Sequence, residues 1–172
     1  MIKSLLLSLS LLLFTTITLA QDFHVPENVN LYTKEDYARY EKDIIAAAGW
    51  LESTPVLNND KKRAMVNLFV MDWIMGSPTI NIEMRGFVLE VMKKNSQFPV
   101  VFMAGYARYV LENNYDKSVL NGYVAGLKSI THLYKLRDGI KRDKKMEKLI
   151  EIEDTGKLNE WVQEKLDRRK KS

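Results

Sequence analysis

Apolar residues recur every three or four positions through nearly every segment after Pro26. This spacing places them along one side of an α-helix and predicts helices that bury that side. Polar and apolar residues alternate only over the five positions 79–83. We interpret those positions as an extended connection, because an isolated strand has no partner to pair with. The sequence therefore predicts an all-α fold.

Capping residues and prolines in the sequence indicate where the helices begin and end. Thr33 with Asp36 predicts a capping box, and 58–60 (Asn-Asn-Asp) predicts an N-cap. Pro99 fits the first position of a helix, and Asp116 fits a cap. The helices expected on these grounds cover about 34–52, 61–75, 83–94, 99–113 and 117 to 136 or 137, with two amphipathic helices after residue 140. Six or seven helices with short loops predict a compact bundle or stacked helical hairpins.

The chain length indicates a single domain. Of 172 residues, about 152 follow an expected signal peptide, so residues 21–172 fit one domain with a basic C-terminal helix or tail. A helical-repeat array is the competing architecture, but the residue spacing of 34-residue tetratricopeptide units is absent. The chain has no cysteine, which excludes disulfides, thiolate metal sites and a cysteine nucleophile.

Residues 1–20 have the pattern of a secretory signal peptide. Lys3 provides the positive start, and 5–14 is an apolar run broken only by two serines. Thr18-Leu19-Ala20 then provides a small residue at the cleavage position. The alternative is a retained membrane anchor, for which the 17 residues from 4 to 20 lie at the short limit. We expect cleavage before Gln21 and a periplasmic or secreted protein.

The formal net charge of +4 is concentrated near the C-terminus, where residues 141–172 contain eleven basic and eight acidic side chains. Much of the excess lies in Arg168, Arg169, Lys170 and Lys171. Such a run is typical of a solvated helix end, where positive charge complements the helix dipole. A weak contact with an anionic surface is the alternative. We expect no nucleic-acid partner for an exported protein.

Asp72 is the most unusual polar residue of the chain. The segment 68–75 is apolar on every side of a helix except at this aspartate, and such helices are usually buried. An isolated buried carboxylate must be paired, hydrogen-bonded or protonated. We therefore expect Asp72 to be buried, either as a structural hydrogen-bond partner or as a weak candidate for a catalytic or ligand-binding group.

The same apolar helices supply candidates for a ligand pocket. Methionine, tyrosine and tryptophan side chains either fill irregular gaps in a core or line an adaptable pocket for an apolar ligand. Arg108 belongs to this group because it could reach Asp72, although it could equally pair with Glu112. The candidate pocket residues are Met71, Trp73, Met75, Tyr106 and Arg108, with Trp50 as a further aromatic position.

Catalytic signals are otherwise weak. Glu83 is the second candidate carboxylate. It shares a predicted helix with Glu90 and lies about 10 Å from it along the helix axis. This arrangement fits poorly with the two carboxyl groups that face each other across a glycosidase cleft. Glu90 fits a surface pair with Lys94. His132 falls on a lysine-rich polar face, and motifs of metalloproteases, serine hydrolases and nucleotide-binding loops are absent. We expect no metal and no cofactor.

Three short segments resemble those of small exported, all-helical bacterial proteins of unknown function. They are 49–55 (GWLESTP), 73–78 (WIMGSP) and 125–129 (AGLKS). The resemblance implies an exported setting in a Gram-negative bacterium and assigns no catalytic residue.

Together these observations favour an exported, non-enzymatic binding or interaction module whose partner is a protein or a small apolar ligand. The alternative is a carboxylate-dependent enzyme that acts on cell-envelope material through Asp72 or Glu83.

Overall fold

The computed structural model describes residues 22–57 and 60–168, and every regular element in these ranges is an α-helix. The prediction of an all-α fold is confirmed, with eight helices in the described ranges where six or seven are expected. The helices are α1 (Lys34–Arg39), α2 (Glu41–Ser53), α3 (Asp60–Gly76), α4 (Gly86–Met92), α5 (Phe98–Glu112), α6 (Val119–Leu136), α7 (Lys144–Asp154) and α8 (Leu158–Arg168).

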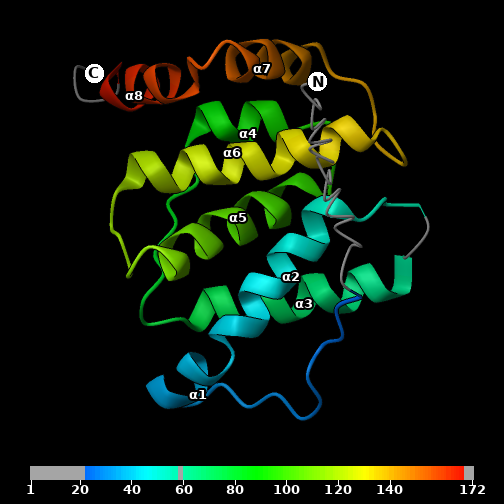
Figure 1. Ribbon diagram of the computed structural model, residues 1–172, viewed down its shortest axis with the longest axis vertical. Coiled ribbons are helices and arrows are strands. Elements are labelled where there is room, and N and C mark those ends of the chain that lie inside the picture. The colour runs from blue at the N-terminus through cyan, green and yellow to red at the C-terminus, as the bar shows by residue number, and fades with distance from the viewer. Residues whose placement is uncertain (1–21, 58–59, 169–172) are drawn as a thin grey trace, which may run out of the picture.

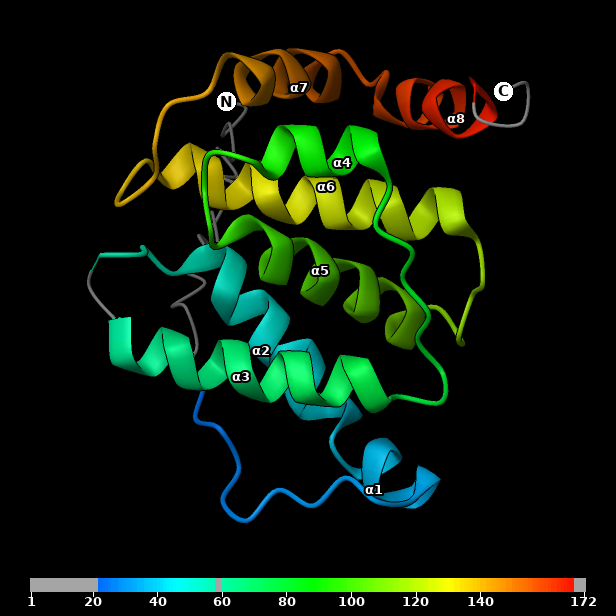
Figure 2. The ribbon, with the colours of Figure 1, turned by 180° about the vertical axis from the view of Figure 1, so that it is seen from behind.

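The helices form successive layers around α5 and α6. Figures 1 and 2 show α2 and α3 on one side of this central pair and α4, α7 and α8 on the other, with α1 at the end farthest from α7 and α8. Helices α5 and α6 are the most deeply buried, which is why their sequences are apolar over wide arcs. Among the described residues, no helix combines the length and apolar character that a membrane span requires.

The α5–α6 contact depends on small residues. A Cβ atom added at Gly126 would lie 2.6 Å from Cδ2 of Phe102 and 2.7 Å from the Phe102 carbonyl oxygen. Both distances are shorter than van der Waals contact, so only glycine fits there. The close approach lets Phe102 pack edge-on against Tyr123, with ring centroids 5.5 Å apart.

The helix ends confirm some local signals and correct others. Thr33 and Asp36 form the expected capping box. The first predicted helix is two helices, because the chain bends at Tyr40 between α1 and α2. Pro99 occupies the second helical position, one residue later than expected. The cap of α6 is Ser118; Asp116 instead accepts hydrogen bonds from the Tyr109 hydroxyl and the Ser118 N–H. The expected cap at 58–60 includes residues outside the described ranges.

Candidate functional site

An open groove lies between α4, α7 and α8, on the side of the bundle that these helices cover. Its volume is about 310 Å³, at the lower end of the range typical of small-molecule sites. The lining residues are Phe87, Glu90, Val91, Lys145, Lys148, Leu149, Ile152, Trp161 and Lys165. We call this the α4–α8 groove.

The floor of the α4–α8 groove is apolar and held by aromatic packing. The rings of Phe87 and Trp161 meet edge to face, with centroids 5.6 Å apart and planes at 79°. On its other side Phe87 lies 5.6 Å from the ring of Tyr123, which is buried in the core. Because the floor is attached to the core through this aromatic chain, its shape exists before any ligand arrives.

The rim of the groove is cationic. Lys145, Lys148 and Lys165 face one carboxylate, Glu90, which forms an ion pair with Lys145. The Lys145 ammonium lowers the pKa of the Glu90 carboxyl, chiefly by hydrogen bonding, so this carboxylate stays ionised at neutral pH. Lys165 lies 5.5 Å from the centroid of the Trp161 ring. Among the described residues Lys148 and Lys165 have no carboxylate partner, which leaves two positive charges beside an apolar floor.

A second hollow of about 580 Å³ adjoins the groove and shares Phe87 and Lys165 with it. Its other lining residues are Glu83, Met84, Arg85, Gly86 and Arg168. Glu83 accepts a hydrogen bond from Nη2 of Arg85 at 2.8 Å. Arg168, at the end of α8, lines this second hollow and forms an ion pair with Glu164 on the same helix.

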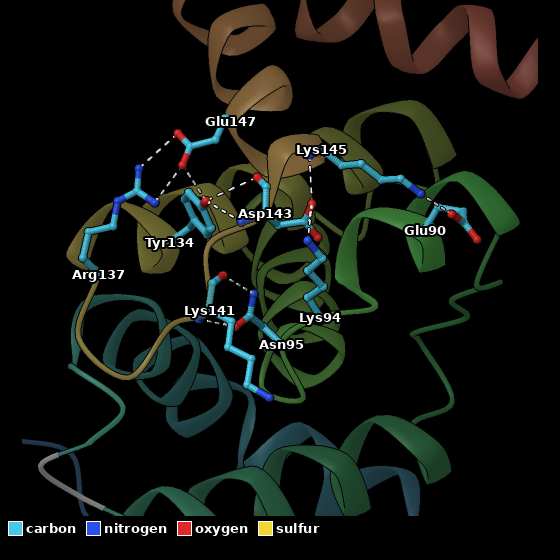
Figure 3. Close-up of polar contacts among 9 residues, drawn as sticks. All are labelled: Glu90, Lys94, Asn95, Tyr134, Arg137, Lys141, Asp143, Lys145 and Glu147. Atoms are coloured by element: carbon cyan, nitrogen blue, oxygen red, sulfur yellow. Dashed lines mark hydrogen bonds and ion pairs between the residues drawn. The ribbon is translucent and has the colours of Figure 1, made fainter.

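Tyr134 fastens α7 to the core at the start of the groove (Figure 3). Its buried hydroxyl accepts a hydrogen bond from the Asp143 N–H at 2.9 Å and donates one to Oε1 of Glu147 at 2.7 Å. Arg137 binds both oxygens of Glu147, at 3.0 and 3.1 Å, and its guanidinium lies 4.2 Å from the centroid of the Tyr134 ring. The first turn of α7 is thereby locked onto the last turn of α6.

A second set of contacts ties the α6–α7 connection to the region between α4 and α5. The side chain of Asn95 accepts from the Lys141 N–H at 2.7 Å and donates to the Lys141 carbonyl at 3.0 Å. Asp143 is buried, caps α7 by accepting from the Lys145 N–H at 2.9 Å, and lies 3.8 Å from the Lys94 ammonium. Lys145 is consequently fixed at the start of α7, where it reaches Glu90 on α4.

The expectation that Asp72 is buried is wrong. Its side chain is exposed, together with the neighbouring Met65, Leu68 and Met75 on the outer side of α3. Helix α3 is apolar on nearly all sides. It packs against α2 and α5, and Phe23 and Tyr37 cover a further part of it, but the outer strip with these three side chains stays exposed. Asp72 and Met75 line a hollow of about 480 Å³ between α3 and the segment that precedes α1.

Glu83 and Glu90 do not share a helix. Helix α4 begins at Gly86, so Glu83 lies in the extended segment before it, where the Tyr123 hydroxyl binds its carbonyl. Glu90 pairs with Lys145 instead of the expected Lys94. Asp72 and Glu83 line different hollows, so the structure does not bring the two candidate carboxylates together.

The remaining pocket candidates are mostly core residues. Trp73 is fully buried and donates its indole N–H to the Tyr37 carbonyl at 2.9 Å. Trp50 and Tyr106 are also buried, and Met71 is partly buried. Arg108 pairs with neither of its expected partners.

Arg108 binds both carboxylate oxygens of Glu52 on α2, at 2.7 and 2.9 Å. Of the C-terminal cations, Arg168 lines the second hollow, whereas 169–171 lie outside the described residues. His132 is exposed, as expected, and no group of three or more histidine or carboxylate side chains suited to a metal ion occurs within the described ranges.

Sequence reasoning missed the groove residues Phe87, Trp161, Lys145, Lys148 and Lys165. One signal lies in the sequence: Trp161 is the only aromatic residue on a helix whose other residues are mostly polar or charged. An aromatic ring in that setting favours a contact or binding surface.

The chain was compared with protein-family models, with curated proteins and with solved structures. It matches none of them.

Proposed function

We propose that this chain is an exported, non-enzymatic binding module that takes a small amphipathic anion in the α4–α8 groove. The observation that carries the proposal is the combination of an apolar floor with a cationic rim in one hollow. A ligand with a hydrocarbon body and a carboxylate or similar head group complements both features.

The two parts of the groove contribute differently to such binding. Burial of a hydrocarbon body against Phe87, Leu149 and Trp161 supplies most of the affinity, at about 25 cal/mol per Å² of apolar surface removed from water. The ammonium groups of Lys148 and Lys165, which have no carboxylate partner in the described part of the chain, select the sign of the head group and accelerate its encounter. An ion pair at such an exposed rim adds about 0–1 kcal/mol, so the charges mainly provide specificity.

Export is part of the proposal and is supported by the pattern of residues 1–20, with Lys3, the apolar run and Ala20 at the cleavage position. An exported module with this groove would act as a carrier or sensor of amphipathic molecules of the cell envelope. Its partners would then be small ligands.

Tryptophan fluorescence tests the proposal, because Trp161 is half-buried in the groove while Trp50 and Trp73 are buried in the core. The probes are dodecanoate, dodecanol and dodecyltrimethylammonium, which share a hydrocarbon chain and differ in head-group charge. We expect dodecanoate to bind below its micelle concentration and to bind at least about tenfold more tightly than the cationic probe.

Charge reversal of one rim lysine provides the matched variant. Lys148→Glu should weaken dodecanoate binding, whereas Lys144→Glu on the same helix changes the net charge equally outside the groove and should leave binding nearly unchanged. Equal binding of all three probes, or equal loss in both variants, would refute the assignment of the groove.

Two further results would point to the other interpretations. Binding to vesicles of anionic lipid without binding of monomeric dodecanoate would favour a surface contact through Arg168 and the basic residues that follow it. Turnover of an envelope polymer that is abolished by Asp72→Asn or Glu83→Gln would favour the enzymatic alternative.

A further inference from the structure

The outer side of α3 carries a row of apolar side chains that the rest of the described chain leaves exposed. They are Met65, Leu68 and Met75, which are 58%, 62% and 72% exposed. Together with Asp72 they follow a spacing of three, four and three residues, so all four side chains lie along one side of the helix. We call these four residues the α3 strip. Neighbouring apolar side chains exposed in this way are typical of a contact surface.

A hollow beside the α3 strip adds depth to this surface. Its volume is about 480 Å³, and Leu68, Asp72 and Met75 form its wall on α3. The facing wall belongs to the segment before α1 and includes Leu31 and Tyr32, of which Tyr32 is 87% exposed. A side chain that enters the hollow therefore contacts apolar groups on two sides.

The charge of the α3 strip restricts what can cover it. Among the described residues, Asp72 is the only charged side chain that lines the hollow. Its carboxylate forms no ion pair or hydrogen bond within the described part of the chain. A purely apolar partner would remove this carboxylate from water without compensation, which is costly. A partner with a lysine or arginine at that point pairs the charge, so the strip selects for one cation within an otherwise apolar surface.

We propose that the α3 strip is the docking surface for an amphipathic helix of another protein, with an apolar side and one lysine or arginine that faces Asp72. The spacing of the strip is that of one helix in a two-helix seam, and a second helix with the same spacing complements it. This protein partner is additional to the small ligands proposed for the α4–α8 groove, which shares no lining residue with the hollow.

A second copy of this chain fits the α3 strip less well. In a parallel pair of α3 helices the two Asp72 carboxylates would face each other. An antiparallel pair that sets Lys61 against Asp72 places Met75 opposite position 58, before the start of the copy's α3 at Asp60. Self-pairing therefore leaves either the charge unpaired or part of the strip uncovered, and a different protein fits better.

Three labelled peptides of about 20 residues, long enough to cover the strip as a helix, test the proposal. Each forms an amphipathic helix with leucine along one side, and they differ only in the residue at the centre of that side, which is lysine, alanine or glutamate. Fluorescence anisotropy follows the binding of each peptide to the full chain. We expect the lysine peptide to bind at least about tenfold more tightly than the glutamate peptide, with the alanine peptide between them.

Reversal of the charge on α3 identifies the contact. Asp72→Lys should invert the order, so that the glutamate peptide binds more tightly than the lysine peptide. Glu151→Lys makes the same change of net charge at an exposed position of α7 and should leave the order unchanged. In an NMR titration of the natural chain, the lysine peptide should shift the amides of Leu68 and Asp72 and leave those of Phe87 and Trp161 in the groove unchanged.

Three results would overturn the proposal. Equal binding of the lysine and glutamate peptides would mean that Asp72 does not select the partner. Absence of binding by all three peptides at about 0.5 mM chain would exclude a helix-docking surface of useful affinity. Dimerisation of the natural chain in sedimentation, abolished by Leu68→Glu, would assign the strip to a second copy. The first two results are measured on the natural chain, so they do not depend on the folding of a variant.

Discussion

At the scale of a single residue, Arg63 shows how a buried charge can bind the unpaired carbonyl groups at the end of a helix. Its guanidinium is almost inaccessible to water, donates to the Leu51 carbonyl at 3.1 Å and also binds the Thr54 carbonyl. The ring of Trp50 lies 5.3 Å away. The last carbonyl groups of a helix have no partner within the helix, and Arg63 on α3 supplies one for the end of α2.

Replacing Arg63 by methionine keeps much of the volume but leaves those two carbonyls without their donor. We expect the free energy of unfolding to fall by about 2–4 kcal/mol, measured by urea denaturation. Arg39→Met, which removes an exposed arginine from α1, should change it by less than about 0.5 kcal/mol. Similar values for the two variants would contradict a role of Arg63 in closing α2.

Glu147 makes stability depend on pH. Hydrogen bonds from Arg137, and secondarily from Tyr134, lower the pKa of this carboxyl below its usual 4.5. The stabilisation is complete above about pH 4.5, where the unfolded chain is also ionised, and is lost as the pH falls through the lower pKa of the folded state. Glu147→Gln should therefore be less stable than the natural chain at neutral pH and should approach it in acid. Urea unfolding at several pH values, with Glu151→Gln as control, measures this convergence.

At the scale of helices, α5 and α6 approach as closely as their glycines allow. Gly126→Ala should force Phe102 or the α5 backbone to move and should cost about 1–3 kcal/mol of stability. Gly86→Ala is the matched control, because nothing lies within 4 Å of a Cβ atom there. Thermal unfolding of the two variants should show a lower midpoint only for the first; equal midpoints would mean that the helix contact relaxes without cost.

The Tyr134 hydroxyl holds α7 and α8 as a unit. Tyr134→Phe leaves the Asp143 N–H without its acceptor and should cost about 1–3 kcal/mol. Amide hydrogen exchange should accelerate in α7 and α8 more than in α5 and α6, because the loss is local to the α6–α7 junction. Tyr109→Phe removes a hydroxyl at the opposite end of α6 and should spare α7 and α8.

Most helices follow from the sequence because the spacing of apolar residues is a local property. Their ends follow less well, since tertiary contacts decide them. Tyr40, where α1 ends and α2 begins, packs edge-on against Phe69 of α3, and Asp116 binds Tyr109 instead of capping α6. Neither contact is visible in the residues that flank it.

The candidate site was harder to predict than the fold. The cationic C-terminal region was evident from composition, but the apolar floor joins Phe87 on α4 to Trp161 on α8, which are 74 residues apart in the chain. The sequence predicts a buried Asp72 because the segment 68–75 is apolar on every other side of the helix. Which side of such a helix faces solvent depends on where its neighbours pack, and a single sequence does not specify that.

At the scale of the whole molecule, the outer side of α3 exposes three large apolar side chains along one strip. Met65, Leu68 and Met75 are 58%, 62% and 72% exposed, and Asp72 is the charged residue among them. A charge inside an apolar strip opposes unwanted association. Asp72→Leu should therefore increase concentration-dependent association, measured by sedimentation. Glu151→Leu, on a charged part of α7, should not; a monomeric Asp72→Leu chain would contradict this role.

The position of α7 and α8 after α4 in the chain has a consequence during synthesis. As the polypeptide emerges from its N-terminal side, α4 is complete more than fifty residues before α7 begins. Phe87 and Val91 are therefore exposed to solvent until the first turn of α7 packs against Tyr134. The nascent chain thus passes through a stage in which the proposed binding groove is incomplete. If the groove binds as we propose, a ligand present at that stage would speed the docking of α7 and α8.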